Sequence, residues 1–152
     1  MSSSEEKTLI LKSSDNEEFV VKESAAVQCI TIKNVVEVGC DLGAIPLLNV
    51  DSKNLAWIIE FMEKHADSTL TDSDKKDFET EFVKKPINDL LGMILAANYL
   101  NFPALMNVLC DACANEIKLW SVEELREKFN IQNDYTEEEE KAVRAENSWA
   151  FE

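Results

Sequence analysis

The strongest constraint on the fold is a helical apolar repeat in the second half of the chain, from Pro86 onward. Apolar side chains recur there at spacings of three and four residues, at Ile87, Leu90, Leu91, Ile94 and Leu95. This spacing places all of them on one face of a helix, which then packs against a core. Pro86 suits a first helical position, and Gly92 leaves room for close packing on a second face. A further helix is predicted after Pro103, so this half of the chain predicts packed helices.

The first half of the chain is richer in strand-forming residues. Segments 8–12 and 19–21 flank a polar turn that contains Asn16, and this pattern predicts a β-hairpin. Asn tolerates the left-handed conformation that such turns often need. A short helix is expected to end near Gly39, and residues 45–50 are expected to form a short strand, in which Pro46 indicates an edge strand or the start of a strand.

A third pattern lies between these two regions. Asp51 or Ser52 is predicted to cap a helix whose apolar stripe consists of Leu55, Ile58, Ile59 and Met62. The polar segment 66–77 follows and is the best linker candidate in the chain. Later, Ser121 with Glu124 and Thr136 with Glu139 have the spacing of capping boxes, which predicts two more helices. Strands that precede helices in this way indicate an α+β protein that is predominantly helical.

The charge of the chain excludes several classes of function. Among its 152 residues, 30 are acidic and 15 are basic, so the formal net charge is −15. Nucleic-acid affinity depends on Lys and Arg that neutralise phosphates, so we expect no nucleic-acid partner. The same charge disfavours anionic membranes, and no apolar stretch approaches the roughly 18–20 residues that span a bilayer. With no signal-peptide pattern at the amino terminus, we expect a protein of the cytoplasm and nucleus with reduced cysteines.

The polar residues do not suggest a catalytic or cofactor site. The single histidine, His65, lies at the end of a predicted helix, where His commonly interacts with the dipole and the last carbonyls. Phosphate-binding and nucleophile-elbow motifs are missing from the sequence. Cys110 and Cys113 have the spacing of half a zinc site, but Cys29 and Cys40 do not form a second pair. Core packing is therefore favoured for Cys110 and Cys113, and we expect neither metal nor cofactor.

The carboxy-terminal end carries more apolar surface than its predicted helix can bury. Around residues 137–146 the only apolar side chains are Ala142, Val143 and Ala145, and the chain then ends with Trp149 and Phe151 close together. One interpretation is that the two aromatic side chains fold back as an intramolecular clasp. The other is that the last helices form an incomplete layer, with the aromatic residues as anchors for a partner. The second interpretation is favoured and predicts a protein that works by binding.

Several long motifs resemble the Skp adaptors, the linker subunits of Skp–cullin–F-box ubiquitin ligases. The most specific are Ile94–Asn101 (ILAANYLN) and the segment from Phe129 (FNIQNDYTEEEE) through to Glu146–Glu152 (ENSWAFE). The ending is most similar to that of plant members. Shorter matches at residues 11–15, 46–50 and 52–56 extend the resemblance over nearly the whole chain.

The resemblance implies a POZ (BTB)-like fold followed by a helical extension that binds F-box proteins. It divides the chain into a POZ-like part at 7–66, a polar linker and short helix at 67–85, central helices at 86–116 and F-box-binding helices at 117–152. Cullin binding is implied for Asn98 and Tyr99, although Tyr99 could equally be a core tyrosine. F-box binding is implied for the apolar residues Ile117, Val122, Leu125, Phe129, Ile131, Val143 and Trp149.

The sequence departs from the pattern of that family in three places. Residues 118–125 (KLWSVEEL) stand where KGKTPEEI is usual, so Trp120 and Val122 alter the loop beside the F-box surface. Pro86 and Gly92 also replace other residues at the central helix. We expect a non-catalytic adaptor between a cullin and F-box proteins. The alternatives are a self-associating POZ protein without cullin binding and a metal- or thiol-dependent enzyme.

Overall fold

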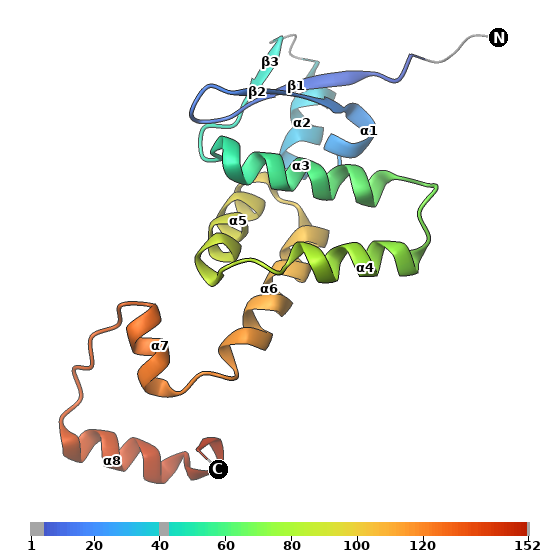
Figure 1. The fold of residues 1–152 in the computed structure, drawn as a ribbon. Coiled ribbons are helices and arrows are strands. Elements are labelled where there is room, and N and C mark those ends of the chain that lie inside the picture. The colour runs from blue at the N-terminus through green and yellow to red at the C-terminus, as the bar shows by residue number, and fades with distance from the viewer. Residues whose placement is uncertain (1–4, 40–42, 152) are drawn as a thin grey trace. The chain divides into compact units, whose positions relative to one another are not determined.

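The computed structural model describes residues 5–39 and 43–151, and the chain forms two compact units, Met1–Asn115 and Glu116–Glu152. The first unit contains a small sheet and six helices among its described residues (Figure 1): β1 (Thr8–Lys12), β2 (Glu18–Lys22), α1 (Glu23–Ala26), α2 (Ile30–Val38), β3 (Ala44–Pro46), α3 (Ser52–Ala66), α4 (Asp72–Phe82), α5 (Ile87–Leu100) and α6 (Pro103–Ile117), whose last residues enter the second unit. The second unit continues with α7 (Val122–Lys128), α8 (Glu137–Glu146) and the short 3-10 helix η1 (Ser148–Ala150). The predicted α+β, predominantly helical class is confirmed.

The predicted hairpin is present at the amino terminus. β1 pairs antiparallel with β2 and parallel with β3, so the strand order is β2-β1-β3. Asn16 takes a positive φ of 66° in the hairpin turn, as expected for an asparagine there. The strand expected over 45–50 is shorter, because β3 ends at Pro46. The chain then turns, with the Val50 amide donating to the Leu47 carbonyl at 3.2 Å, and this turn leads into the next helix.

Two carboxylates cap the amino terminus of α3. The predicted cap Asp51 accepts from the Asn54 amide at 2.8 Å, and Asp15 of the hairpin turn accepts from the Ser52 amide at 2.8 Å. Hydrogen bonds from the Ser52 hydroxyl, and next from Ser13, lower the pKa of Asp15 to about 2. The hairpin turn is therefore attached to the start of α3 by an ionised side chain.

An aromatic cluster forms the centre of the first unit. Phe61 of α3 is fully buried, and its ring lies 5.5 Å from Phe102, 5.4 Å from Phe82 and 6.2 Å from Phe78, measured between centroids. Phe78 and Phe82 belong to α4, which begins within the segment expected to be a linker. The linker expected over 66–77 is thus too long, because a capping box of Thr71 and Asp74 starts α4 and its phenylalanines need burial.

Two expectations for α5 and α6 are only partly correct. Leu90 is buried as the apolar stripe predicts, but Leu95 is 73% exposed, because the face of α5 that meets the core is formed by Leu90, Met93, Ala96, Ala97 and Leu100. Likewise Cys113 is buried in α6 whereas Cys110 is exposed. Gly92 is not required by packing either, since a Cβ there would meet the Asn54 side chain at an ordinary 3.5 Å.

The second unit has both predicted capping boxes but little interior. Ser121 with Glu124 begins α7, and Thr136 with Glu139 begins α8. Neither of these helices, nor η1, contains a buried residue. Within the described ranges of both units, none of the helices has the length and apolar character needed to cross a bilayer.

Candidate functional site

The carboxy-terminal end of α5 presents a mixed apolar and polar surface in the first unit. Asn98 is exposed, Tyr99 is half-buried, and Leu95 lies one turn earlier on the helix. These three residues are spaced by three and four positions, so they are neighbours on the helix surface. We refer to Leu95, Asn98 and Tyr99 as the α5 patch. Asn98 and Tyr99 are the residues for which the sequence predicted cullin binding, and that role stays a prediction.

Backbone contacts with α2 hold the α5 patch in place. The Thr31 hydroxyl donates to the carbonyl of Tyr99 at 3.0 Å, and the Ile30 amide donates to the carbonyl of Asn101 at 3.1 Å. Asn101 ends α5 in a left-handed conformation with φ 52°. The side chains of the α5 patch are therefore carried on a fixed helix end, which favours a preorganised contact surface.

All seven residues predicted to bind F-box proteins lie in the second unit. Four are half-buried there: Ile117, Val122, Leu125 and Phe129. The other three are more exposed, at 55% for Ile131, 37% for Val143 and 74% for Trp149. The Phe129 ring packs against Trp120 with centroids 5.7 Å apart, and the Lys128 ammonium lies 4.7 Å from the Trp120 ring centre. Trp120, which departs from the family pattern, thus packs against Phe129, one of the residues predicted to bind F-box proteins.

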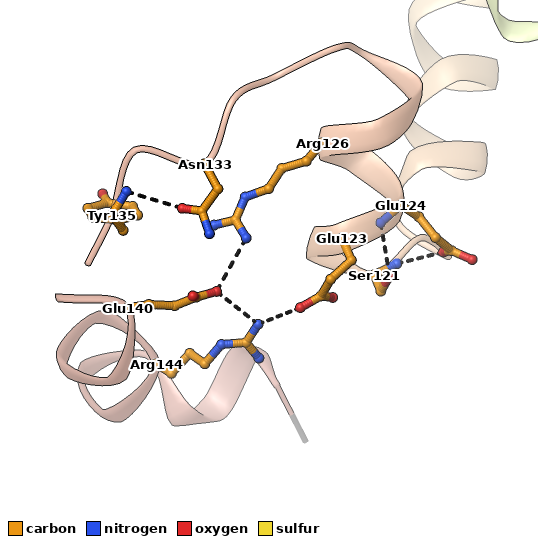
Figure 2. A network of polar contacts seen from close by, with 8 residues as sticks. All are labelled: Ser121, Glu123, Glu124, Arg126, Asn133, Tyr135, Glu140 and Arg144. Atoms are coloured by element: carbon orange, nitrogen blue, oxygen red, sulfur yellow. Dashed lines mark hydrogen bonds and ion pairs between the residues drawn. The ribbon is translucent and has the colours of Figure 1, made fainter. Parts of the chain in front are cut away.

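Charged side chains, rather than a core, connect α7 with α8 (Figure 2). Arg144 of α8 contacts Glu123 of α7 at 2.9 Å and Glu140 of its own helix at 3.5 Å. Arg126 of α7 contacts the same oxygen of Glu140 at 3.3 Å. The hydrogen bond from Arg126 is the main cause that lowers the pKa of Glu140 below its ordinary value. The pairs lie near the surface, where each contributes modestly, but shared partners make them a network.

The two aromatic residues at the carboxy terminus have different surroundings. Phe151 is 44% exposed, and the Arg144 guanidinium lies 4.9 Å from the centre of its ring. Trp149 is 74% exposed. The intramolecular clasp considered from the sequence therefore describes Phe151, whereas Trp149 presents most of its surface to solvent. Trp149 is one of several large apolar side chains that are exposed in the second unit, with Leu119, Ile131 and Tyr135 among the others.

The sequence did not single out several residues of this surface. Leu119 is 78% exposed and Tyr135 is 51% exposed in the second unit. Neither belongs to a periodic apolar stripe, so helical periodicity could not predict their place on this surface. Glu140 and Arg144 do have the four-residue spacing of a helical ion pair, and from this spacing the sequence could have predicted their contact. The contacts of Arg126 and Arg144 across two helices required the tertiary structure.

His65 takes part in packing rather than in a reactive cluster. Its ring stacks on Phe61 with centroids 4.0 Å apart, and its Nε2 atom lies 2.9 Å from a Glu79 oxygen of α4. His65 lies in the last turn of α3, as expected, and its side chain also contacts α4. Burial raises the pKa of the Cys29 thiol to about 12, which keeps it protonated. Cys40 lies outside the described residues, and no group of metal-binding side chains occurs among the others.

Comparison with known proteins matches an amino-terminal and a carboxy-terminal segment of the chain to the same family. Residues 7–67 match the tetramerisation domain of the Skp1 family, and residues 103–150 match its dimerisation domain. SKP1-like protein 10 of Arabidopsis thaliana is 46% identical over 96% of this chain and 98% of its own length. SKP1-like protein 4 of the same plant is 43% identical, covering 96% and 97%. SKP1-like protein 1 of Oryza sativa subsp. japonica is 40% identical, covering 97% of each chain.

Proposed function

The chain belongs to the Skp1 family, and on that basis we propose that it is a non-catalytic adaptor that joins a cullin to F-box substrate receptors in a ubiquitin ligase. The proposal rests on one observation in the second unit: α7, α8 and η1 contain apolar side chains but no buried residue. Such helices leave apolar surface that a partner can cover. The F-box helices of a substrate receptor are the partner proposed for this surface.

The α5 patch is the surface proposed for the cullin. It lies in the first unit, whereas the F-box surface lies in the second, so the two partners would use different residues. An adaptor with two separate sites acts by raising the effective concentration of one partner near the other. In this mechanism the chain itself needs no reactive group. The buried thiol of Cys29 and the packed imidazole of His65 agree with that role.

The proposal is tested with two pairs of charge-introducing substitutions at exposed or half-buried positions. Asn98→Lys with Tyr99→Lys should abolish capture of a purified cullin amino-terminal domain while F-box binding is retained. Ile131→Lys with Trp149→Lys should have the opposite effect, and each pair serves as the matched control of the other. Circular dichroism confirms that both variants are folded. Loss of both partners from either folded variant would rule out two separate sites.

Self-association is the alternative within the same class of protein. Both matched domains of the Skp1 family are described by their assembly, as a dimerisation and a tetramerisation domain. Light scattering of the purified chain, alone and with an F-box domain, separates the two functions. An adaptor should form a complex with the F-box domain at equal stoichiometry. A dimer that does not change on addition of the F-box domain favours the alternative.

A further inference from the structure

We propose that Arg144 is a positioning residue that connects α7, α8 and the carboxy-terminal turn, and thereby fixes the direction in which Trp149 meets the partner. This inference rests on the proposed function, because it assigns the partner contact to an F-box protein. It adds a residue that lies outside the predicted F-box-binding set and orients Trp149, which lies within it. The assignment comes from three contacts that meet at one guanidinium group.

The first two contacts join the helices. The Arg144 Nη2 atom lies 2.9 Å from Glu123 of α7 and 3.5 Å from Glu140 of α8. In Figure 2, the guanidinium of Arg144 lies between these two carboxylates. Glu140 is also held by Arg126 at 3.3 Å, so its carboxylate has two cationic partners. Since neither helix contains a buried residue, these contacts replace a hydrophobic core in setting their arrangement.

The third contact joins α8 to the end of the chain. The Ala150 amide donates to the Asn147 carbonyl at 2.9 Å, and the Phe151 amide donates to the Ser148 carbonyl at 3.1 Å. This tight turn returns Phe151 toward α8, where the Arg144 guanidinium lies 4.9 Å from its ring centre. Trp149 sits within the turn and stays 74% exposed. Fixing Phe151 therefore fixes the backbone that presents Trp149.

The chemistry of arginine suits this position better than that of lysine. A guanidinium is planar, so it donates hydrogen bonds to carboxylates in its plane while its face stacks on an aromatic ring. An ammonium group is a compact point charge and cannot make both kinds of contact in the same way. Arg126 does not duplicate this role, because it pairs with Glu140, whereas the group that lies over the Phe151 ring is that of Arg144. Arg144 is thus the residue that links all three elements.

The test uses residues 1–152 with three substitutions, each made separately. Arg144→Gln removes the charge and the stacking group, and Arg144→Lys retains the charge alone. Lys141→Gln is the matched control, because it removes a positive charge from the same helix at an exposed position that forms no ion pair with any described residue. Hydrogen exchange of residues 137–151 reports the order of the turn. The fluorine NMR signal of 5-fluorotryptophan at position 149, assigned with Trp149→Phe, reports its surroundings.

We expect Arg144→Gln to speed exchange in residues 137–151 about tenfold, as loss of a small network of surface pairs implies. The Trp149 signal should shift, and affinity for purified plant F-box domains should fall about tenfold in parallel. Raising the salt concentration should move the wild-type chain toward the Arg144→Gln behaviour and leave that variant unchanged. Arg144→Lys should not restore the wild-type values, and Lys141→Gln should match the wild type.

Three outcomes would overturn the inference. Arg144→Gln could behave like Lys141→Gln, Arg144→Lys could match the wild type in every measurement, or exchange could change without any loss of F-box affinity. A further outcome separates this inference from the proposed function. If no F-box domain binds the wild-type chain while exchange and the Trp149 signal respond as expected, the positioning role stands and the proposed partner is wrong.

Discussion

Phe61 and Trp149 are both large aromatic residues, but Phe61 is fully buried in the first unit whereas Trp149 is 74% exposed in the second. Phe61 contacts three other phenylalanine rings, two from α4 and one from Phe102, the residue before α6. Trp149 lies in a short turn that backbone hydrogen bonds close and that the contact of Phe151 with Arg144 joins to α8. The first unit thus encloses an aromatic cluster, whereas α7, α8 and η1 of the second unit contain no buried residue. The difference separates Phe61, which supports the fold, from Trp149, which belongs to the surface proposed to bind a partner.

The largest effect that tests this comparison is a loss of stability on substitution of Phe61. Phe61→Ala should lower the free energy of unfolding by about 3–5 kcal/mol, because it leaves a cavity in the aromatic cluster. Urea unfolding followed by circular dichroism measures the change. Trp149→Ala is the matched control and should alter stability by less than about 0.5 kcal/mol. Equal losses of stability in the two variants would show that the second unit has an interior of its own.

The same Trp149→Ala substitution should have its effect on binding instead. We expect F-box binding to weaken by about 2 kcal/mol, as for the loss of an aromatic anchor at the centre of an interface. Isothermal titration calorimetry with a purified F-box domain measures the change. Leu48→Ala in the first unit is the control, since Leu48 is 73% exposed but belongs to neither proposed surface. An unchanged affinity in Trp149→Ala would remove Trp149 from the proposed interface.

A smaller effect is expected from the two matched capping boxes, one in each unit. Thr71→Ala should reduce the global stability of the first unit by about 1 kcal/mol, because α4 is part of its core. Thr136→Ala removes the same kind of hydrogen bond from α8, where fraying should stay local because no core is disturbed. Hydrogen exchange distinguishes global from local opening. The comparison fails if Thr136→Ala also increases exchange in α3.

The smallest effect sharpens the comparison through pH. The pKa of Asp15 is about 2 in the folded protein and about 3.9 in an unfolded chain, so its ionised form favours folding. This contribution is fully present above about pH 4 and is lost as the pH falls toward 2. The thermal midpoint of Asp15→Asn should therefore depend less on pH in this window than that of the wild type. Asp111→Asn, which removes an exposed charge from α6, should retain the wild-type dependence.

Local patterns predicted the beginnings and ends of elements better than their surroundings. The caps at Asp51, Ser121 and Thr136 follow from hydrogen bonds within one turn, and all three are present. The same reasoning overlooked the cap at Thr71, because a polar run resembles a linker until Phe78 and Phe82 are seen to pack on Phe61. For Leu95 and Cys110, the sequence showed apolar character but not which neighbours would cover it. Whether a side chain is buried depends on which other element packs against its helix, and the sequence of one helix does not specify that neighbour.

The candidate sites divide in the same way. From the sequence came the excess of carboxylates, the motif around Asn98 and Tyr99, and an apolar end that is too large for its helix. Each of these depends only on which residues are present and how they are spaced. The tertiary structure alone showed that Trp149 is exposed while Phe151 is held by Arg144, and that Glu140 has two arginine partners. Those facts depend on how α7, α8 and the carboxy-terminal turn come together, as Arg126 and Glu140 do across two helices. Residue spacing alone does not specify such contacts, because they are set by the packing of one element against another.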